Sequence, residues 1–250
     1  MIILSSLPNK DAFFETIIYL ISTYYNYFLM GIVYTLILSI VGTIGGFLIS
    51  SVFTLVRTQE IDYIRQSRIK NTILRFLHSI IDIYINIFRG TPMMVQAMIF
   101  YYGLSRLQLD FWTPMVAGIF VVTLNTTAYL AEILRSGING ISKGQLEASR
   151  SLGFSHNQGM IYVVLPQAIR NSLPAITNEF IINLKDTSVL SVIGVTELFR
   201  ATQLATAPNY RTTEGFFIAA MLYLLLTFFS SRIVNYIEKK LKSDVVKVAS

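Results

Sequence analysis

The sequence predicts an all-α integral membrane protein with about five transmembrane helices. The chain has 250 residues, of which 53% are hydrophobic and only 14% are charged, whereas a soluble domain carries about a quarter charged residues. The apolar residues form continuous runs, several of them long enough to cross a bilayer as a helix of about 20 residues. Transmembrane barrels alternate apolar and polar residues instead. Helical spans are therefore expected.

We expect a transmembrane domain over residues 26–240, with spans at residues 27–56, 86–104, 113–136, 174–195 and 214–236. The first span contains Gly42, Gly45 and Gly46, small residues that permit close helix packing. The second is preceded by an apolar lead-in near the cytoplasmic surface. Pro92, which lies within this second span, lacks a backbone donor and predicts a kink or a helix start at that point.

Two terminal segments flank this domain. Residues 1–25 contain an apolar stripe with helical spacing, which predicts an amphipathic helix on the outer membrane surface. Residues 241–250 form a basic tail. The stripe consists of Phe13, Phe14, Ile17, Ile18, Leu20 and Ile21, with Asp11 and Glu15 opposite.

The basic residues predict the orientation. Fourteen of the 20 Lys and Arg residues flank the spans on the side of a polar loop at residues 137–173. By the positive-inside rule that loop and the C-terminus are cytoplasmic and the N-terminus is outside, as in a multi-pass protein of a bacterial plasma or inner membrane. The net charge of +6 thus reflects orientation signals, and we expect no nucleic-acid partner.

The polar loop is the only long polar interval in the chain. Ser142 is positioned to cap a short helix, and Gly153 to end it in a left-handed conformation. Ser155 then predicts a second N-cap, for a helix halted by Pro166. The first helix carries an apolar and small-residue face onto which another protein could close. The pattern alone also fits an amphipathic interfacial segment with no partner. That face comprises Leu146, Ala148, Ser149 and Leu152.

The loop resembles the coupling loop of ABC importer permeases. The family signature reads Glu-Ala-Ala, three residues, Gly, nine residues, then Ile-x-Leu-Pro. Here it reads Glu147-Ala148-Ser149, Gly153 and Val163-Val164-Leu165-Pro166, with Ser149 and Val163 as departures. The resemblance implies a fold like that of the methionine-importer permease, with a cytoplasmic two-helix coupling loop that sits in a cleft of an ATPase subunit. The ATPase-coupling residues it implies are Gly144, Glu147, Ala148, Ser149, Leu152 and Gly153.

The predicted fourth span contains charged residues, which cost about 2.5–3.5 kcal/mol each at mid-bilayer on insertion scales. Glu179, Asn183 and Asp186 are spaced at i, i+4 and i+7, which places them on one helical face. One interpretation is a self-neutralising structural network. We favour a translocation surface for a cationic or zwitterionic solute. Gln96, Asn125 and Thr126 could line the same cavity, and hydrogen bonding between helices explains each of them equally well.

Three further segments resemble permeases of polar amino-acid ABC importers. They are Phe88–Gln96, Ala128–Arg135 and Leu184–Val195. The resemblance covers about residues 28–240. It implies a second permease subunit, identical or paralogous, ABC ATPase subunits and an extracytoplasmic binding protein that delivers an amino acid. Some members hold a basic amino acid at the acids matching Glu179 and Asp186.

The expected function is amino-acid import by alternating access, with no catalysis in this chain. The sequence has no phosphate-binding loop, so ATP and Mg²⁺ are expected on the ATPase subunit and no cofactor here. The chain has no cysteine, and His78 and His156 lie far apart, so no metal site is expected. An ion- or proton-coupled secondary carrier is the alternative, and a scaffold protein that uses the loop as a dock is a third hypothesis.

Overall fold

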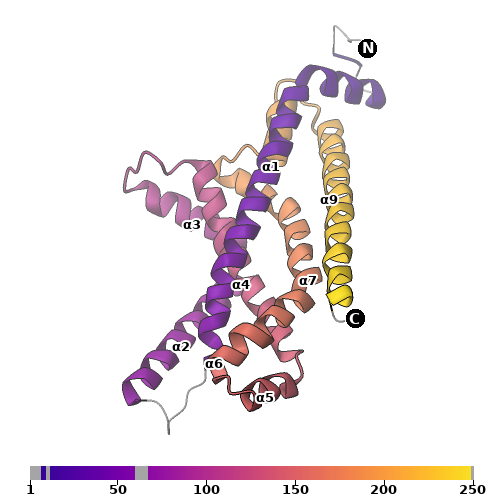
Figure 1. Cartoon of the computed structure of the whole chain (residues 1–250). Helices are drawn as coiled ribbons and strands as arrows, with labels where there is room; N and C mark the ends of the chain where they lie inside the picture. The colour runs from indigo at the N-terminus through magenta and orange to yellow at the C-terminus, as the bar shows by residue number, and fades with distance from the viewer. Residues whose placement is uncertain (1–6, 10–11, 60–66, 249–250) are drawn as a thin grey trace. The chain divides into compact units, whose positions relative to one another are not determined.

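The computed structural model describes residues 7–9, 12–59 and 67–248. Part of the predicted N-terminal segment, including Lys10 and Asp11, residues 60–66 between the first two predicted spans and the last two tail residues lie outside these ranges. Every element in the described ranges is helical (Figure 1). The elements are α1 (Phe13–Arg57), α2 (Arg68–Gly90), α3 (Met93–Ser105), α4 (Pro114–Asn139), α5 (Lys143–Ser151), α6 (His156–Gly159), the π-helix η1 (Met160–Val164), α7 (Leu165–Asp186), the 3₁₀-helix η2 (Thr187–Ile193), α8 (Leu198–Thr206) and α9 (Thr212–Val248).

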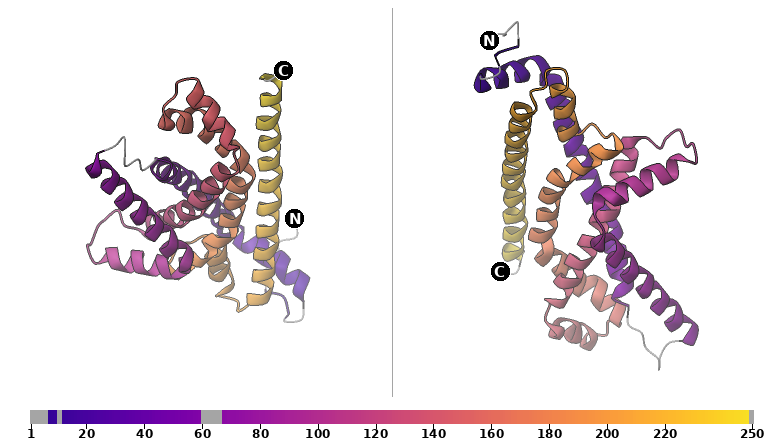
Figure 2. Two further views of the ribbon diagram at one scale, coloured as in Figure 1. Left: turned by 90° about the horizontal axis from the view of Figure 1, so that it is seen from below. Right: turned by 180° about the vertical axis from the view of Figure 1, so that it is seen from behind.

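The helices form two compact units. Unit 1 comprises Met1–Val41, Met94–Val122 and Phe180–Ser250. Unit 2 comprises Gly42–Met93 and Thr123–Glu179, and so contains the α5–α6 segment. The views in Figure 2 show α9, which belongs to unit 1, as one uninterrupted helix.

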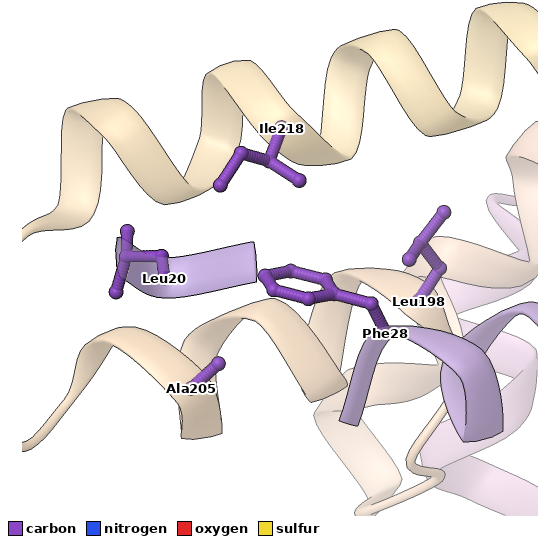
Figure 3. Close-up of a cluster of buried hydrophobic side chains, with 5 residues drawn as sticks. All are labelled: Leu20, Phe28, Leu198, Ala205 and Ile218. Atoms are coloured by element: carbon purple, nitrogen blue, oxygen red, sulfur yellow. The ribbon is translucent and has the colours of Figure 1, made fainter. Parts of the chain in front are cut away.

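The core of unit 1 forms where α8 packs against α1 and α9. Five buried side chains from these three helices come together there (Figure 3). Glu197 caps α8, accepting hydrogen bonds from the backbone N–H groups of Phe199 at 2.8 Å and Arg200 at 2.9 Å. The Tyr223 hydroxyl on α9 donates a third, at 2.7 Å. These three hydrogen bonds offset the cost of burying the Glu197 carboxyl group. The five apolar residues are Leu20, Phe28, Leu198, Ala205 and Ile218.

Gly31 allows α1 and α8 to approach closely, and Gly31→Ala is expected to destabilise the chain by about 1–3 kcal/mol. A Cβ at this position would lie 2.8 Å from the Leu198 Cα and 2.8 Å from the Ala201 Cβ, so backbone would have to move. Thermal unfolding of the purified chain measures the effect. Gly103→Ala is the matched control, because a Cβ there meets nothing within 4 Å. Equal melting temperatures for the two variants would contradict this packing.

A kink in α1 separates the N-terminal segment from the rest of the helix. Tyr24 has non-helical backbone angles (φ −113°, ψ 20°), and its hydroxyl accepts a hydrogen bond from the Asn209 side chain at 2.9 Å. The kink falls at the boundary predicted near residue 25. Within the predicted apolar stripe, Leu20 is buried in the core of unit 1 while Phe14 and Ile18 are exposed. The placement of this segment on the outer membrane surface stays a prediction.

Three helices in the described part of the chain are long and apolar enough to cross a membrane. They are Phe13–Arg57, Pro114–Asn139 and Thr212–Glu238. They include the predicted first and fifth spans and all of the predicted third span except Thr113. The predicted second span is divided, because α2 ends at Gly90 and α3 begins at Met93. The break predicted at Pro92 is thereby confirmed.

Unit 2 packs the C-terminal half of α1 against α2, α4 and α7. Leu130 and Leu134 of α4 pack with Ile176 of α7, and Ile81 and Ile85 of α2 pack with Ala131 of α4.

The predicted close packing at the first-span glycines is found at two of them. A Cβ on Gly45 would lie 2.9 Å from the Thr123 side chain, and one on Gly46 would lie 2.9 Å from Thr126 and 3.1 Å from the backbone nitrogen of Thr127.

The prediction that Pro166 halts a helix is wrong. It lies in the first turn of α7, and α6, η1 and α7 follow one another without a gap from His156 to Asp186. In an α-helix the proline ring would clash with the carbonyl four residues earlier. The π-helix η1, which ends two residues before Pro166, has a wider turn and so relieves this clash. As a result α7 begins at Leu165 and Pro174 lies inside it, so the helix of the predicted fourth span starts well before residue 174.

Candidate functional site

The coupling segment of unit 2, which we define as residues 142–159, is a tight helical elbow. Helix α5 follows Ser142 as predicted, although the Ser142 side chain makes no capping hydrogen bond. Gly153 has φ +90°, which confirms the predicted left-handed end. The backbone N–H of Phe154 donates to the Ser149 carbonyl at 3.1 Å, and that of Gly153 to the Arg150 carbonyl at 3.0 Å. This pair of bonds is the Schellman arrangement that satisfies helix-end carbonyls.

The second arm of the elbow begins with the predicted Ser155 cap, which is confirmed. The Ser155 hydroxyl accepts from the Gln158 N–H at 3.3 Å, and the Gln158 side chain accepts from the Ser155 N–H at 2.9 Å. This capping box was not predicted, although Ser-x-x-Gln in the sequence signals it. The Gln167 side chain donates to the Gln145 side chain at 3.3 Å and so joins α5 to α7. The elbow is thus held at its turn, at the start of its second arm and at its base.

Five of the six predicted coupling residues have exposed side chains or backbone in the described structure: Gly144, Glu147, Ala148, Leu152 and Gly153. Leu152 is 81% exposed, and an apolar side chain this open is typical of an interaction surface. Ser149 differs, because it is buried and its hydroxyl donates to the Leu146 carbonyl at 2.7 Å. Its side chain therefore packs inside the elbow, and the outward-facing surface consists of its neighbours.

Gly159 is expected to be essential for the elbow, and Gly159→Ala should destabilise it. A Cβ there would lie 2.5 Å from the Ser149 Oγ and 2.8 Å from the Leu146 Cδ1, so α5 and α6 must separate, at a cost of about 1–3 kcal/mol. Hydrogen exchange of residues 143–159 measures the opening. The Ser149→Gly, Gly159→Ala double variant should recover part of the protection. An elbow equally protected in wild type and Gly159→Ala would contradict this packing.

Three predicted substrate-facing residues lie in unit 2. Glu179 on α7 is buried, Thr126 on α4 is fully buried and Asn125 is half-buried. Thr126 packs against Gly46, which supports its helix-packing interpretation. The role of all three in substrate binding stays a prediction.

The other three predicted substrate-facing residues lie in unit 1. Gln96 on α3 and Asn183 on α7 are buried, whereas Asp186 is exposed. Asp186 is the last residue of α7, and the chain tightens into the 3₁₀-helix η2 immediately after it. The residues predicted to share one face of α7 therefore differ in exposure, with Glu179 and Asn183 covered and Asp186 open.

An ion-pair cluster in unit 2 was not predicted from the sequence. Glu132 on α4 accepts from Arg57 of α1 at 3.1 Å and from Arg135 of α4 at 2.8 Å, and lies 3.7 Å from Arg89 of α2. Arg57 also pairs with Asp82 of α2 at 2.8 Å. The cluster joins three helices, and it brings together Arg89 and Glu132, which lie in two of the segments that carry the family resemblance.

The described residues contain no group of three or more His, Cys, Asp or Glu side chains that could hold a metal ion. His78 and His156 instead approach carbonyls at the end of α1. Their Nε2 atoms lie 2.9 Å from the Val56 oxygen and 3.1 Å from the Thr58 oxygen, respectively. Both histidines thus contact backbone carbonyls at the end of α1.

Comparison with known proteins decides the family. A family model described as "Binding-protein-dependent transport system inner membrane component" matches residues 69–243. The chain belongs to this family. The predicted recognition of an ABC importer permease, made from the loop signature and the three segments, is confirmed.

Named permeases are similar to most of the chain. It is 41% identical over 169 residues to the arginine transport system permease protein ArtQ of Bacillus subtilis (strain 168), covering 66% of this chain and 75% of that protein. It is 30% identical over 222 residues to the probable glutamine ABC transporter permease protein GlnM of the same organism, covering 88% and 95%. Both names place the relatives among amino-acid permeases.

Solved structures of transporter permeases share the fold. The chain matches a chain of "an amino acid ABC transporter with histidines" with a TM-score of 0.74 and 34% identity, covering 88% of this chain and 96% of that one. It matches a chain of the MetNI methionine ABC transporter in an inward-facing conformation with a TM-score of 0.68 and 20% identity, covering 86% and 95%. The second match shows the fold alone, and it agrees with the predicted all-α methionine-importer-like architecture.

Proposed function

We propose that this permease imports polar amino acids, that a separate ATPase subunit drives it, and that an extracytoplasmic binding protein supplies its solute. The exposed surface of the α5 elbow carries this proposal. Glu147, Ala148 and Leu152 face outward on a segment held rigid by its caps and by the Ser149–Gly159 contact. A rigid, partly apolar projection suits docking into a partner, since little conformational freedom is lost on binding.

Basic amino acids are the substrates that the chain's own residues favour. The names of the relatives include arginine and glutamine, so the comparison alone supports polar amino acids as a class. Glu179 and Asp186 add carboxylates to the polar residues of α7, and carboxylates within spans normally face a cavity or a partner. A cationic side chain is the solute group that they would attract.

Transport would proceed by alternating access between two permease subunits, identical or paralogous, with the loop and C-terminus cytoplasmic and the N-terminus outside. ATP-driven closure of the ATPase subunits would move the α5 elbows and open the cavity outward, and hydrolysis would reset it. Energy enters through the different contacts that the elbow makes with the two ATPase states. This chain holds neither ATP nor Mg²⁺ and catalyses no reaction.

A panel of amino acids tests the substrate class. In proteoliposomes holding the permease, its ATPase and its binding protein, arginine, lysine or histidine should stimulate ATP hydrolysis, and Asp186→Asn should reduce this stimulation several-fold. An exposed carboxylate is screened by water, so a complete loss is not expected. Stimulation by neutral amino acids alone, unchanged in Asp186→Asn, would assign specificity to the binding protein instead.

A further inference from the structure

Unit 2 contains a cavity of about 320 Å³ beside the ion-pair cluster. It lies between the C-terminal end of α1, the C-terminal half of α4 and the α6–η1 segment. A water molecule takes about 30 Å³ in the liquid, so the cavity has room for a larger group. Its lining residues are Thr54, Arg57, Thr58, Ala131, Arg135, Ile138, Asn139, His156 and Met160.

Thr54, one of the residues that line this cavity, has a buried hydroxyl that the protein leaves unpaired. Thr54 is 3% exposed, and its Oγ1 is buried with no hydrogen-bond partner. Two nearby hydroxyls, one on α1 and one just after it, are paired in the usual way, since the Ser51 hydroxyl donates to the Phe47 carbonyl at 2.7 Å and the Thr58 hydroxyl to the Leu55 carbonyl at 3.0 Å. A buried unpaired hydroxyl is costly. A ligand in the cavity would satisfy it.

The ion-pair cluster beside the cavity carries an excess of positive charge. Three guanidinium groups and two carboxylates are joined by the ion pairs of Glu132 and Asp82, so the cluster carries a net charge of +1. Arg57 and Arg135 are the two members that line the cavity. Each presents several donors in a fixed plane, an arrangement that suits an oxyanion better than a halide. The site is therefore complementary to a small, negatively charged group with several oxygens.

We propose that this cavity binds a phosphate group, either a free phosphate ion or the headgroup of an anionic phospholipid. A tetrahedral phosphate offers enough acceptor oxygens to engage Arg57, Arg135 and the Thr54 hydroxyl at once. The bound group would neutralise the excess charge and tie the ends of α1 and α4 to α6. Because none of the lining residues belongs to the predicted substrate-binding or ATPase-coupling residues, the site stands independently of the proposed function.

Thermal unfolding of the full-length purified chain in a neutral detergent tests the site. Potassium phosphate is compared with potassium chloride at equal ionic strength. Phosphate should raise the wild-type melting temperature in a saturable way, as a ligand that binds the folded state does. Thr54→Val should raise the half-saturating phosphate concentration by about threefold or more, because it removes one hydrogen bond to the phosphate. Thr227→Val is the matched control, because the Thr227 hydroxyl on α9 bonds to its own helix at 2.9 Å.

Lipid binding separates the two sources of phosphate. The chain is placed in nanodiscs of phosphatidylglycerol or of phosphatidylcholine, and native mass spectrometry counts the lipids that it retains. Preferential retention of phosphatidylglycerol that Arg135→Gln reduces, with little response to free phosphate, identifies a lipid headgroup as the ligand. A saturable response to free phosphate with no lipid preference identifies the free ion.

Three results would overturn the proposal. The first is a melting temperature that follows ionic strength alone, together with no lipid preference. The second is a phosphate response or lipid preference that is identical in wild type and both variants, which would place the anion elsewhere. The third is a lower melting temperature of Thr54→Val than of wild type in phosphate-free buffer, since it would show that the hydroxyl already has a partner.

Discussion

Glu147→Lys is expected to reduce solute-stimulated ATP hydrolysis by roughly tenfold or more while the permease stays folded. Glu147 is exposed on α5, and the Ser151 hydroxyl donates to its backbone carbonyl rather than to its carboxylate, so reversing the charge of the side chain changes the exposed surface of the elbow. A coupling free energy of 1–3 kcal/mol corresponds to about 5- to 150-fold, and a reversed charge facing the ATPase removes much of it. ATP hydrolysis with and without solute measures the effect.

The melting temperature and a second charge reversal serve as controls for this experiment. The melting temperature of Glu147→Lys should stay within about 2 °C of wild type, because exposed substitutions rarely change stability by more than 0.5 kcal/mol. Glu15→Lys reverses another exposed acid on α1, outside the coupling segment, and should keep full stimulation. Unchanged stimulation in Glu147→Lys would show that this face of α5 does not contact the ATPase.

Glu179→Gln is expected to reduce uptake of basic amino acids by roughly tenfold or more. The substitution keeps the shape and removes the charge of a buried side chain, and losing a charged partner costs a cationic ligand about 1.5–3 kcal/mol. The effect should exceed that of Asp186→Asn, because Glu179 is buried whereas Asp186 is exposed. Uptake of radiolabelled arginine and glutamine into proteoliposomes separates the two solute classes, with glutamine nearly unaffected.

The rival interpretation of Glu179 is a structural network within the protein, and it makes a different prediction. In that case Glu179→Gln lowers the melting temperature and reduces uptake of both solutes equally. Asn178→Ala is the matched control on the same helix, because Asn178 is exposed and should change neither quantity. Equal losses of arginine and glutamine uptake would therefore contradict a role of Glu179 in recognising the cationic side chain of the solute.

Local signals explain why the elbow could be predicted from the sequence. Gly153 is left-handed because a glycine there costs nothing sterically, and Ser155 caps because its hydroxyl reaches a nearby N–H. Both depend on a few adjacent residues. The loop signature that resembles ABC importer permeases lies in the same part of the sequence. It predicted the family membership that the comparisons confirm.

Contacts between distant residues could not be predicted in this way. The cluster around Glu132 needs Arg57 of α1 and Asp82 of α2 to meet the helix that carries Glu132 and Arg135. The sequence indicates the Glu132–Arg135 pair through its i, i+3 spacing, but no spacing brings Arg57 and Asp82 to it. Ser149 was assigned to the docking surface for the same reason, since only the fold shows that Gly159 covers it. Pro166 was misinterpreted because a preceding π-helix lets the chain continue past a proline.

The central claim is that ATP hydrolysis on a partner subunit drives uptake through this permease, and ATP-dependent uptake tests it most directly. Proteoliposomes containing the permease, its ATPase and its binding protein are loaded with ATP or a non-hydrolysable analogue, and ionophores abolish all ion gradients. The account predicts that arginine accumulates against its gradient only with hydrolysable ATP inside. Accumulation without ATP that follows an imposed ion or proton gradient would contradict it and establish a secondary carrier.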